Sequence, residues 1–408
     1  MRTLASAPTT TEPRRPIVLV THSYYEEDPR VRRQAEAILA AGHPVEVISL
    51  RRPDDPSDGV VAGVGVHRLD VQRHQGAGLG TYMAEYLAFF VRVALRLVRT
   101  QPRRHYALVQ VATLPDWLVL AALPLRLSGV PVLLDLHESM PDFFRSRFPR
   151  AANPVIFRAL RLAERVSVAA ATHAITVNDA LRDRLIGLGV RPGRVDVVRN
   201  TPSFARFDRW AHAPRAFMAD GSLRLVYAGA LTPTYELDVA IRAIATLRTL
   251  RPDLPVTFDV YGRGDSRPSL EALAAALGLT ERVAFHGRIA IEAVPPAITA
   301  ADIGLAPTRR DAFTDSSLST KILEYAAMRR PVVASRLPLV ERTFPPGTVA
   351  TYEPGDAAGL AAAILRLVDD APARRASVDR TARFVMTMRW EDDAQAYLAL
   401  LEGLMRPG

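Results

Sequence analysis

The sequence predicts an α/β fold of two tandem, Rossmann-like doubly wound domains that face each other across a cleft. Short apolar runs alternate with helical patterns along the whole chain, as in the βαβ units that build parallel sheets. The length of 408 residues exceeds what one hydrophobic core usually supports, so two domains are expected.

The first half of the chain supplies five strand candidates with helical stretches between them. The helix expected at 28–42 places Val31, Ala35 and Ile38 on one face and ends at Gly42. The candidate strands are 16–22, 45–50, 107–112, 131–137 and 173–178. We expect these elements to form an N-terminal domain over residues 16–205.

The second half repeats this plan. Its candidate strands are 223–229, 256–262, 282–287, 301–307 and 331–335, and each is followed by a helical pattern. We expect a C-terminal domain over 218–388, joined to the first by the Pro-rich stretch 200–217. The last helix, within 389–408, has no strand left to pair with and is expected to pack back on the N-terminal domain. Residues 1–15 lack the apolar core of a secretory signal and are expected to be a disordered tail.

The composition of the chain restricts the cellular locations and the binding partners that we expect. The chain has no cysteine, so a disulfide framework and a thiolate metal site are excluded, and a cytoplasmic location fits. Charged residues at 85, 92 and 96 interrupt the apolar window 83–98 before it reaches the length of a membrane span. The net charge of +9 is spread over the chain and no recognition module is visible, so nucleic acid is not expected as a partner.

Two basic stretches indicate that a membrane surface is an alternative partner. Arginines alternate with aromatic and aliphatic residues in 89–105 and again in 143–165. A basic amphipathic helix can lie on anionic lipid, which would place the protein at the inner face of the cell membrane. The commoner arrangement is a helix that covers the sheet and leaves its arginines in water.

A dinucleotide cofactor is not expected. The loop after the first strand, "THSYYEEDPR" (21–30), contains no glycine, whereas a pyrophosphate needs the close backbone approach that a G-x-G-x-x-G loop allows. The short "GRGDSR" (262–267) does not replace it. No nicotinamide, flavin or other cofactor is therefore predicted.

The segment "TDSSLSTKILEYAAMRRPVVAS" (314–335) offers a better phosphate site. Its Lys321 is the only lysine in a chain with 52 Lys plus Arg. We expect Asp315, Ser316 or Ser317 to cap a helix whose free N–H groups bind an anion, with Lys321 about one turn in and Glu324 on nearly the same face. This layout suits a nucleoside diphosphate. The alternative is a surface Lys–Glu pair, although such a pair would tolerate arginine.

The segment 316–335 resembles the donor-binding segment of the retaining glycosyltransferases with GT-B fold, the family-four group. Four further stretches are similar to this family and follow its order: 28–50, "DLHE" (135–138), 175–208 and 225–244. The resemblance implies a glycosyltransferase that moves a sugar from a nucleotide-diphosphate sugar to a hydroxyl, with retention.

The resemblance also implies roles for individual residues. Glu324 would bind the ribose, and the backbone of Leu318 to Thr320 would hold the diphosphate with Lys321. His137 would lie at the transferred sugar. The predicted catalytic residues are His137, Lys321 and Arg263; the predicted donor-binding residues are Gly229, Gly262, Arg309, Ser316, Ser317, Leu318, Ser319, Thr320 and Glu324; Glu138 and Arg30 are placed on the acceptor side.

Several positions depart from the family pattern. Ser316 stands where the family has its first acidic residue, with Asp315 beside it, and Ala230 and Tyr235 stand where it has an Arg and a Lys. The leaving group would then depend on other cations, for which Arg263, Arg309 and Arg310 are candidates. The stretch "SYYEEDPR" (23–30) replaces the Gly-rich first loop, so Arg30 is a candidate for phosphate contact from the N-terminal domain.

The predicted reaction needs no metal, because no D-x-D pair or His cluster of metal-ligand spacing is present. The acceptor is expected to be a glycan, a lipid-linked molecule or a small molecule. Two alternatives share the fold. An epimerase or hydrolase would act on the nucleotide sugar without an acceptor, and a partner subunit would bind it without catalysis, as the missing cations at 230 and 235 allow.

Overall fold

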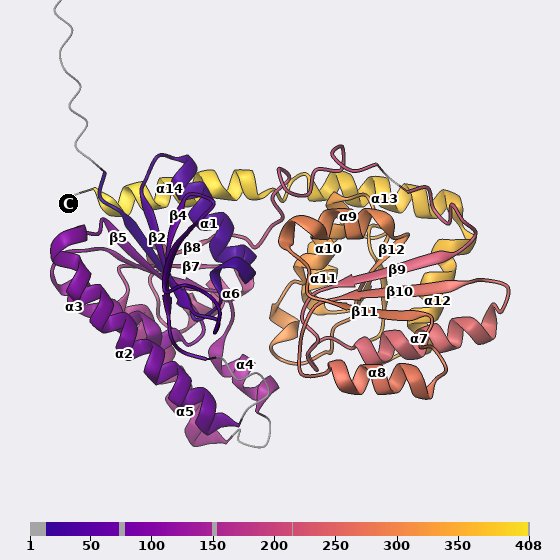
Figure 1. Ribbon diagram of the computed structural model, residues 1–408, viewed down its shortest axis with the longest axis horizontal. Coiled ribbons are helices and arrows are strands. Elements are labelled where there is room, and N and C mark those ends of the chain that lie inside the picture. The colour runs from indigo at the N-terminus through magenta and orange to yellow at the C-terminus, as the bar shows by residue number, and fades with distance from the viewer. Residues whose placement is uncertain (1–13, 73–77, 149–152, 214, 407–408) are drawn as a thin grey trace, which may run out of the picture.

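The computed structural model describes residues 14–72, 78–148, 153–213 and 215–406, which form two α/β domains (Figure 1). Each domain has one sheet covered by helices on both faces, so the predicted architecture is confirmed. Most of the tail expected at 1–15 lies outside the described residues. Within its described end, Arg14 donates a hydrogen bond to the carbonyl of Ala41 at 2.9 Å.

The first domain is built on an eight-stranded sheet in the order β3-β4-β2-β1-β5-β6-β7-β8. All neighbouring strands are parallel except the β3–β4 hairpin. The strands are β1 (Ile17–Val20), β2 (Val45–Leu50), β3 (Asp58–Val61), β4 (Val64–Leu69), β5 (Leu108–Ala112), β6 (Val132–Leu136), β7 (His173–Thr176) and β8 (Val195–Val197). The five strands predicted in this half are β1, β2, β5, β6 and β7.

Sequence reasoning missed the edge strands β3, β4 and β8. In β4 buried and half-exposed residues alternate, and in β3 exposed and half-exposed residues alternate, so continuous buried apolar runs are absent from both strands. Ala62 and Gly63 turn the hairpin with φ of 49° and 83°, a pair of positive values typical of a tight two-residue turn. β8 has only three residues.

Two layers of helices enclose this sheet. One face carries α1 and α14, and the other carries α2, α3, α5 and the short 3-10 helix η2 (Asp116–Ala122). α1 begins after Asp28, which caps its free N–H groups, and buries Val31, Ala35 and Ile38 as predicted. The helices are α1 (Pro29–Ala40), α2 (Leu79–Arg104), α3 (Leu123–Leu127), α4 (Met140–Arg147), α5 (Pro154–Ala170), α6 (Asp179–Gly187) and α14 (Trp390–Met405).

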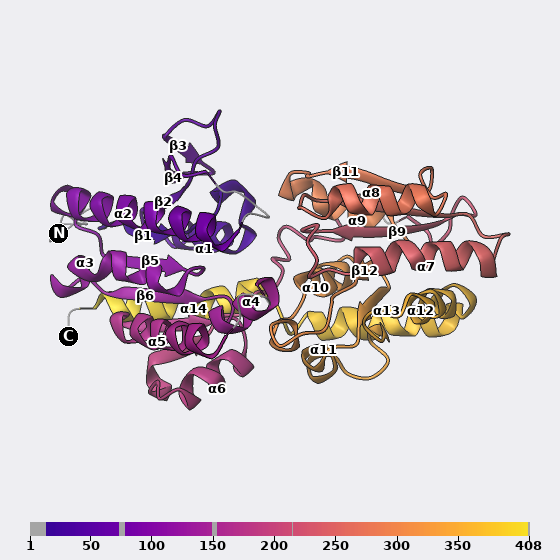
Figure 2. The same ribbon diagram turned by 90° about the horizontal axis from the view of Figure 1, so that it is seen from below.

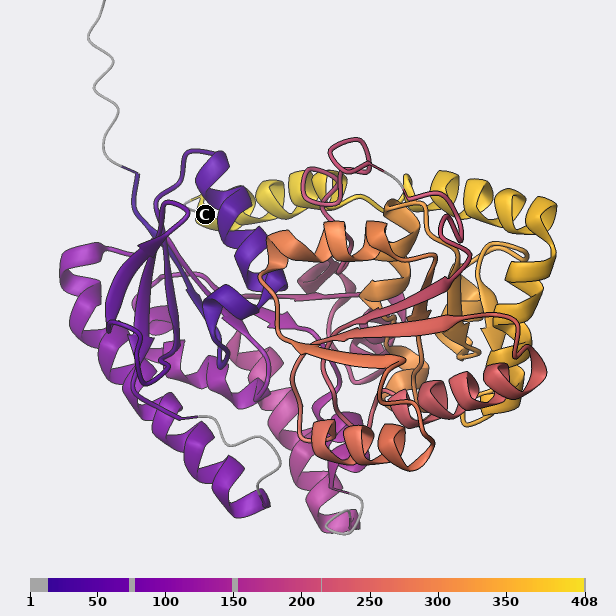
Figure 3. The same cartoon turned by 45° about the vertical axis from the view of Figure 1, so that its right-hand side comes forward.

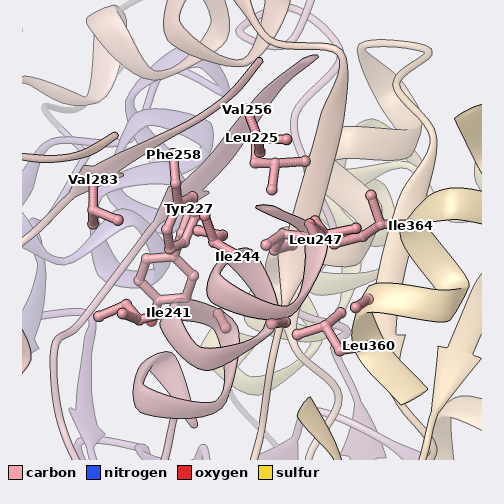
Figure 4. Close-up of a cluster of buried hydrophobic side chains, with 14 of the residues drawn as sticks. Leu225, Tyr227, Ile241, Ile244, Leu247, Val256, Phe258, Val283, Leu360 and Ile364 are labelled. Carbon is pink, nitrogen blue, oxygen red and sulfur yellow. The ribbon is translucent and has the colours of Figure 1, made fainter. Parts of the chain in front are cut away.

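The second domain has a six-stranded, all-parallel sheet in the order β11-β10-β9-β12-β13-β14. Its strands are β9 (Leu223–Ala228), β10 (Val256–Tyr261), β11 (Val283–Gly287), β12 (Ile303–Ala306), β13 (Val332–Ser335) and β14 (Ala350–Tyr352). Its helices are α7 (Leu237–Leu250), α8 (Arg267–Ala276), α9 (Val294–Ala300), α10 (Thr320–Ala327), α11 (Pro338–Thr343), α12 (Ala357–Asp369) and α13 (Ala371–Val385). Side chains of β9, β10, α7 and α12 fill the core between sheet and helices (Figure 4).

The chain crosses between the domains twice, and both crossings lie on the same side of the molecule (Figures 1 and 3). The first crossing is the segment between β8 and β9, and the second leads from α13 to α14. α14 packs on the first domain, where Trp390, Tyr397 and Leu401 share a core with β1 and α1. The Tyr397 hydroxyl donates a hydrogen bond to Gln110 in β5.

Side chains that follow the carboxyl ends of the two sheets bridge the domains. Ser146 Oγ donates to Asp311 at 2.7 Å, and Asn178 Nδ2 donates to the Ser316 carbonyl at 3.0 Å. Further bridges are Arg147 to Asp265 at 3.0 Å, Arg32 to Glu292 at 2.7 Å, Arg288 to Glu27, and the edge-to-face rings of Phe143 and Phe313 at 5.7 Å. Because ligands of open parallel sheets bind at these ends, the site is expected at this interdomain face.

Candidate functional site

The helix that bears Lys321 starts later than predicted. Asp315 and Ser316 lie in a separate 3-10 turn, Thr314–Ser316, because the Asp311 carboxylate accepts hydrogen bonds from the backbone of Phe313 and Thr314 at 2.9 Å each. The prediction that Asp315, Ser316 or Ser317 caps the helix is therefore wrong. α10 begins at Thr320, with Ser319 at the N-cap, and Lys321 is its second residue.

Lys321 lies in a buried aromatic slot. Its side chain is 6% exposed, and its Nζ is 3.8 Å from the centroid of the Tyr235 ring and 5.1 Å from that of Tyr227. Within the described residues no carboxylate forms an ion pair with it, so the alternative of a surface pair is wrong. Aromatic faces offset only part of the cost of burying a charge, and the slot therefore favours an incoming anion.

Two predicted glycines shape this slot. A Cβ at Gly229 would lie 2.1 Å from Cε and 2.8 Å from Nζ of Lys321, so glycine leaves the space that the lysine side chain fills. Gly262 has φ of 147°, and a Cβ there would lie 1.7 Å from the carbonyl oxygen of Gly229. The loops after β9 and β10 thus meet backbone to backbone beside the ammonium group.

Glu324 is half-buried and lies one turn after Lys321 on α10. Burial raises the pKa of Glu324 above the ordinary glutamate value, although nearby Lys321 and Arg33 and a hydrogen bond from the Thr320 hydroxyl oppose the rise. Residues three apart on a helix share a face, so this carboxylate is placed beside whatever binds at the start of α10.

The other predicted donor-side residues lead into α10. The Ser319 hydroxyl is buried and has no hydrogen-bond partner in the described structure. Leu318 packs on the apolar cluster beneath α10, and Ser316 contributes its carbonyl to the bridge with Asn178. Ser317 ends the 3-10 turn. This segment therefore holds α10 in place while leaving the start of the helix without a side-chain cap.

The predicted arginines of the second domain are less enclosed. Arg263 and Arg309 follow β10 and β12, the strands on either side of β9, and both are exposed. The backbone N–H of Arg309 donates to the Thr234 carbonyl at 2.8 Å, which ties its loop to the loop carrying Tyr235. Arg310 lies 3.4 Å from Asp315. These side chains are exposed cations on the loops that follow β10 and β12.

His137 lies on the first-domain side and is held by Asp135. The His137 Nε2 donates to Asp135 Oδ2 at 3.0 Å, and Gln34 and Gln110 donate to the same oxygen at 2.8 and 3.0 Å. Burial alone would raise the pKa of Asp135, but His137 and these hydrogen bonds bring the pKa below its ordinary value. The opposite ring nitrogen, Nδ1, is buried and has no partner among the described residues. It is therefore available to a ligand.

Arg30 and Glu138 lie in the same electrostatic cluster. Arg30 Nε donates to Asp28 at 3.1 Å. Burial lowers the pKa of Arg30, but Asp28 and then Glu138 more than reverse this and raise the pKa overall. The Arg30 guanidinium is thus already engaged by a carboxylate.

Sequence reasoning missed Arg33, which is 9% exposed and joins several parts of the site. Its Nη1 donates to the Thr201 carbonyl at 2.6 Å, and its guanidinium stacks 4.6 Å from the Trp390 ring. Burial lowers the pKa of Arg33 to about 10, and the group lies close enough to Glu324 and Asp135 to interact with both. Since it lies off the apolar stripe of α1, a helical pattern predicts it in water.

The described ranges hold neither a cluster of metal-ligating side chains nor a helix that could span a membrane. No group of three or more His, Asp or Glu side chains there is placed to hold a metal ion. No helix in those ranges combines the length and apolarity that crossing a bilayer requires. What the interdomain face does offer is a buried cation, free helix N–H groups, a carboxylate and an oriented imidazole.

Family comparisons match both domains. Residues 28–201 match the Glycosyl transferase 4-like domain, and residues 222–370 match the Glycosyl transferases group 1 family. The chain is 28% identical to glycogen synthase of Mycobacterium tuberculosis over 92% of both chains. It is also 28% identical to alpha-D-kanosaminyltransferase of Streptomyces kanamyceticus, over 63% of this chain and 66% of that protein.

The fold has solved counterparts. Sucrose-phosphate synthase from Thermosynechococcus elongatus superposes with a TM-score of 0.76 at 19% identity, over 96% of this chain and 99% of that one. Because family models match both domains, the resemblance of the sequence to this family is confirmed. The chain belongs to the family-four-like glycosyltransferases of GT-B fold, and it is an enzyme that transfers a glycosyl group from a nucleotide sugar.

Proposed function

We propose that the donor diphosphate binds at the start of α10, beside Lys321, with its ribose on Glu324. The observation that carries this proposal is the buried Lys321 ammonium, which has aromatic faces around it but no paired anion among the described residues. The hydroxyl of Ser319 and the free N–H groups of the first turn of α10 supply further donors at the same helix end.

In the proposed reaction the bond between the sugar C1 and the diphosphate oxygen breaks, and its electron pair stays on the diphosphate. Preorganised positive charge at the leaving group usually supplies the largest stabilisation of such a transition state. Lys321 and the α10 N–H groups supply it in place, and the exposed side chains of Arg263 and Arg309 can add to it without a metal ion.

The acceptor oxygen forms the new bond to C1 on the face that the diphosphate leaves, and its proton passes to a diphosphate oxygen. This order gives retention of configuration. His137 is proposed to bind the transferred sugar, because Asp135 fixes its ring and leaves Nδ1 to accept a hydrogen bond from a sugar hydroxyl.

The acceptor is proposed to be a glycan, a lipid-linked molecule or a small molecule that enters from the first-domain side, near Glu138 and Arg30. A cytoplasmic location with peripheral association to an anionic membrane is part of this proposal. Its support is the basic, amphipathic character of α2 and α5.

The test is to incubate the protein with a panel of nucleotide sugars and to follow release of the nucleoside diphosphate, with and without acceptors. Release that depends on an acceptor, with NMR of the product showing a retained anomer, supports the proposal. Release or isomerisation without an acceptor identifies an epimerase or hydrolase instead. Calorimetric donor binding without any turnover identifies a binding subunit.

A further inference from the structure

The outer helical face of the first domain exposes an unusual amount of apolar surface. This face is formed by the outward residues of α2, α3 and α5, which cover one side of the sheet with α3 between the two longer helices (Figure 2). Nine of the thirteen exposed large hydrophobic side chains of the described structure lie on these three helices. They are Met83, Leu87, Val91, Leu95, Val98, Leu127, Val155, Leu162 and Val166.

The spacing of these residues makes continuous stripes. In α2 they recur at intervals of four, four, four and three residues from Met83 to Val98, which keeps them on one side of a helix. In α5 Val155, Leu162 and Val166 follow in the same way. α2 has 26 residues, so its stripe runs along a helix about 39 Å long. Such stripes normally pack against a partner.

The charge of the face is of one sign. Arg92, Arg99 and Arg103 are exposed on α2, and Arg158, Arg161 and Arg165 are exposed on α5. The single carboxylate of each helix, Glu85 in α2 and Glu164 in α5, is buried. Outward-pointing cations beside apolar stripes complement the anionic headgroups and acyl chains of a bilayer surface.

We infer that the outer helical face lies on the surface of an anionic lipid bilayer. A second copy of the chain fits less well, because a twofold contact would bring arginines against arginines with no exposed carboxylate of α2 or α5 to pair with them. The inference rests on the membrane association proposed above. It goes further by naming the surface of the protein that makes the contact.

The outer helical face borders the interdomain site. α2 and α5 begin at the carboxyl edge of the parallel sheet, and the Tyr82 ring in the first turn of α2 lies 5.7 Å from that of Phe148, just after α4. α4 in turn bonds to the donor side through Ser146 and Asp311. A lipid-linked acceptor in the bilayer would therefore meet the entrance on the first-domain side.

The experiment is flotation of the full chain with vesicles of phosphatidylglycerol mixed into phosphatidylcholine, compared with phosphatidylcholine alone. We expect binding to the anionic vesicles only, and a decrease as salt is raised. The double variant Leu87→Gln/Leu162→Gln should bind about tenfold more weakly or worse, because both side chains lose their apolar contact. Arg92→Gln and Arg161→Gln should each reduce binding about fivefold.

Matched controls come from α7 in the other domain. Leu250 is 58% exposed, against 57% for Leu87, and Arg242 is exposed like Arg92. Leu250→Gln and Arg242→Gln should leave flotation unchanged.

Absence of flotation with anionic vesicles would overturn the inference, as would binding of Leu87→Gln/Leu162→Gln equal to that of the parent protein. A concentration-dependent dimer that this double variant abolishes, without vesicle binding, would assign the face to a second copy. Calorimetry of nucleoside diphosphate on the same samples reports on the donor site independently.

Discussion

The two domains present polar groups of different kinds at the interdomain face. On the first-domain side the charged groups are already paired, since Asp135 accepts three hydrogen bonds and Arg30 is engaged by Asp28. On the second-domain side the Lys321 ammonium meets ring faces, and the Ser319 hydroxyl has no partner in the described structure. The charged groups named on the first-domain side are therefore paired before a ligand binds, whereas the ammonium on the second-domain side is not.

This difference indicates that the second-domain side binds the anionic part of the ligand. A buried ammonium without an anion destabilises the empty protein, and that cost is recovered when a diphosphate arrives. A paired network such as that of Asp135 and His137 is rigid beforehand and changes little on binding. Substitutions in the second-domain slot should therefore affect diphosphate binding and turnover most, whereas those on the first-domain side should affect turnover alone.

The largest effect is expected for Lys321→Met, which keeps an unbranched side chain one atom shorter and removes its charge. We expect kcat/KM for diphosphate release to fall by about 10² to 10³-fold, since one preorganised donor at a developing charge is worth that much. The thermal midpoint of unfolding should stay equal or rise, because a buried charge is removed. Activity within a few-fold of the parent would contradict the assigned slot.

Gly229→Ala should come next, with a loss of about tenfold to 10²-fold, because a Cβ 2.1 Å from Lys321 Cε must displace the ammonium. Gly403→Ala is the matched control, since a Cβ at Gly403 in α14 meets nothing within 4 Å. In the Lys321→Met background Gly229→Ala should cost little more, because both changes act through one group. Full additivity of the two losses would show that Gly229 acts separately.

The sequence predicted the frame of this site well because its signals are local. Short apolar runs predicted ten of the strands, and the lone lysine drew attention to the helix that bears Lys321. The strands β3 and β4 escaped because about half of their residues are not apolar, and β8 and β14 escaped because each has only three residues. The start of α10 was placed too early because Asp315 and Ser316 are good caps in isolation, while in the folded chain Asp311 binds the turn before them.

Long-range contacts could not be predicted from local patterns. Tyr235 reads in the sequence as a missing lysine, yet its ring lies 3.8 Å from the ammonium of Lys321, which is 86 positions further along the chain. Arg33 reads as a surface residue of α1, and only the return of α14 buries it against Trp390. Both depend on tertiary packing. The two tyrosines on either side of Gly229, Tyr227 and Tyr235, were the only feature of the sequence that could have indicated an aromatic slot.

His137→Gln tests the first-domain side. We expect a fall in kcat of about tenfold or more, because the sugar loses an oriented hydrogen-bond partner, while the affinity for nucleoside diphosphate alone stays unchanged. His286→Gln is the control, since His286 forms a similar pair with Asp259 at 2.6 Å on β10. If His137→Gln weakened diphosphate binding as much as turnover, the separation between the two sides of the site would be lost.

The smallest effect is expected for Glu324→Gln, which keeps the shape of the side chain and removes its charge. Affinity for a nucleoside diphosphate should fall about tenfold, because a charged hydrogen bond to the ribose is lost, whereas affinity for pyrophosphate should not change.

The pH dependence of nucleoside diphosphate binding gives a second measure of the role of Glu324. Burial raises the pKa of Glu324, so its carboxylate becomes protonated at a higher pH than that of an ordinary glutamate. On acidification the parent protein should therefore begin to lose affinity at a higher pH than it would if Glu324 had the ordinary glutamate pKa. The difference between parent and Glu324→Gln, measured by calorimetry with the same ligand, should therefore shrink as pH falls. A difference that is constant with pH, or that appears equally with pyrophosphate, would place Glu324 at the phosphates or outside the site.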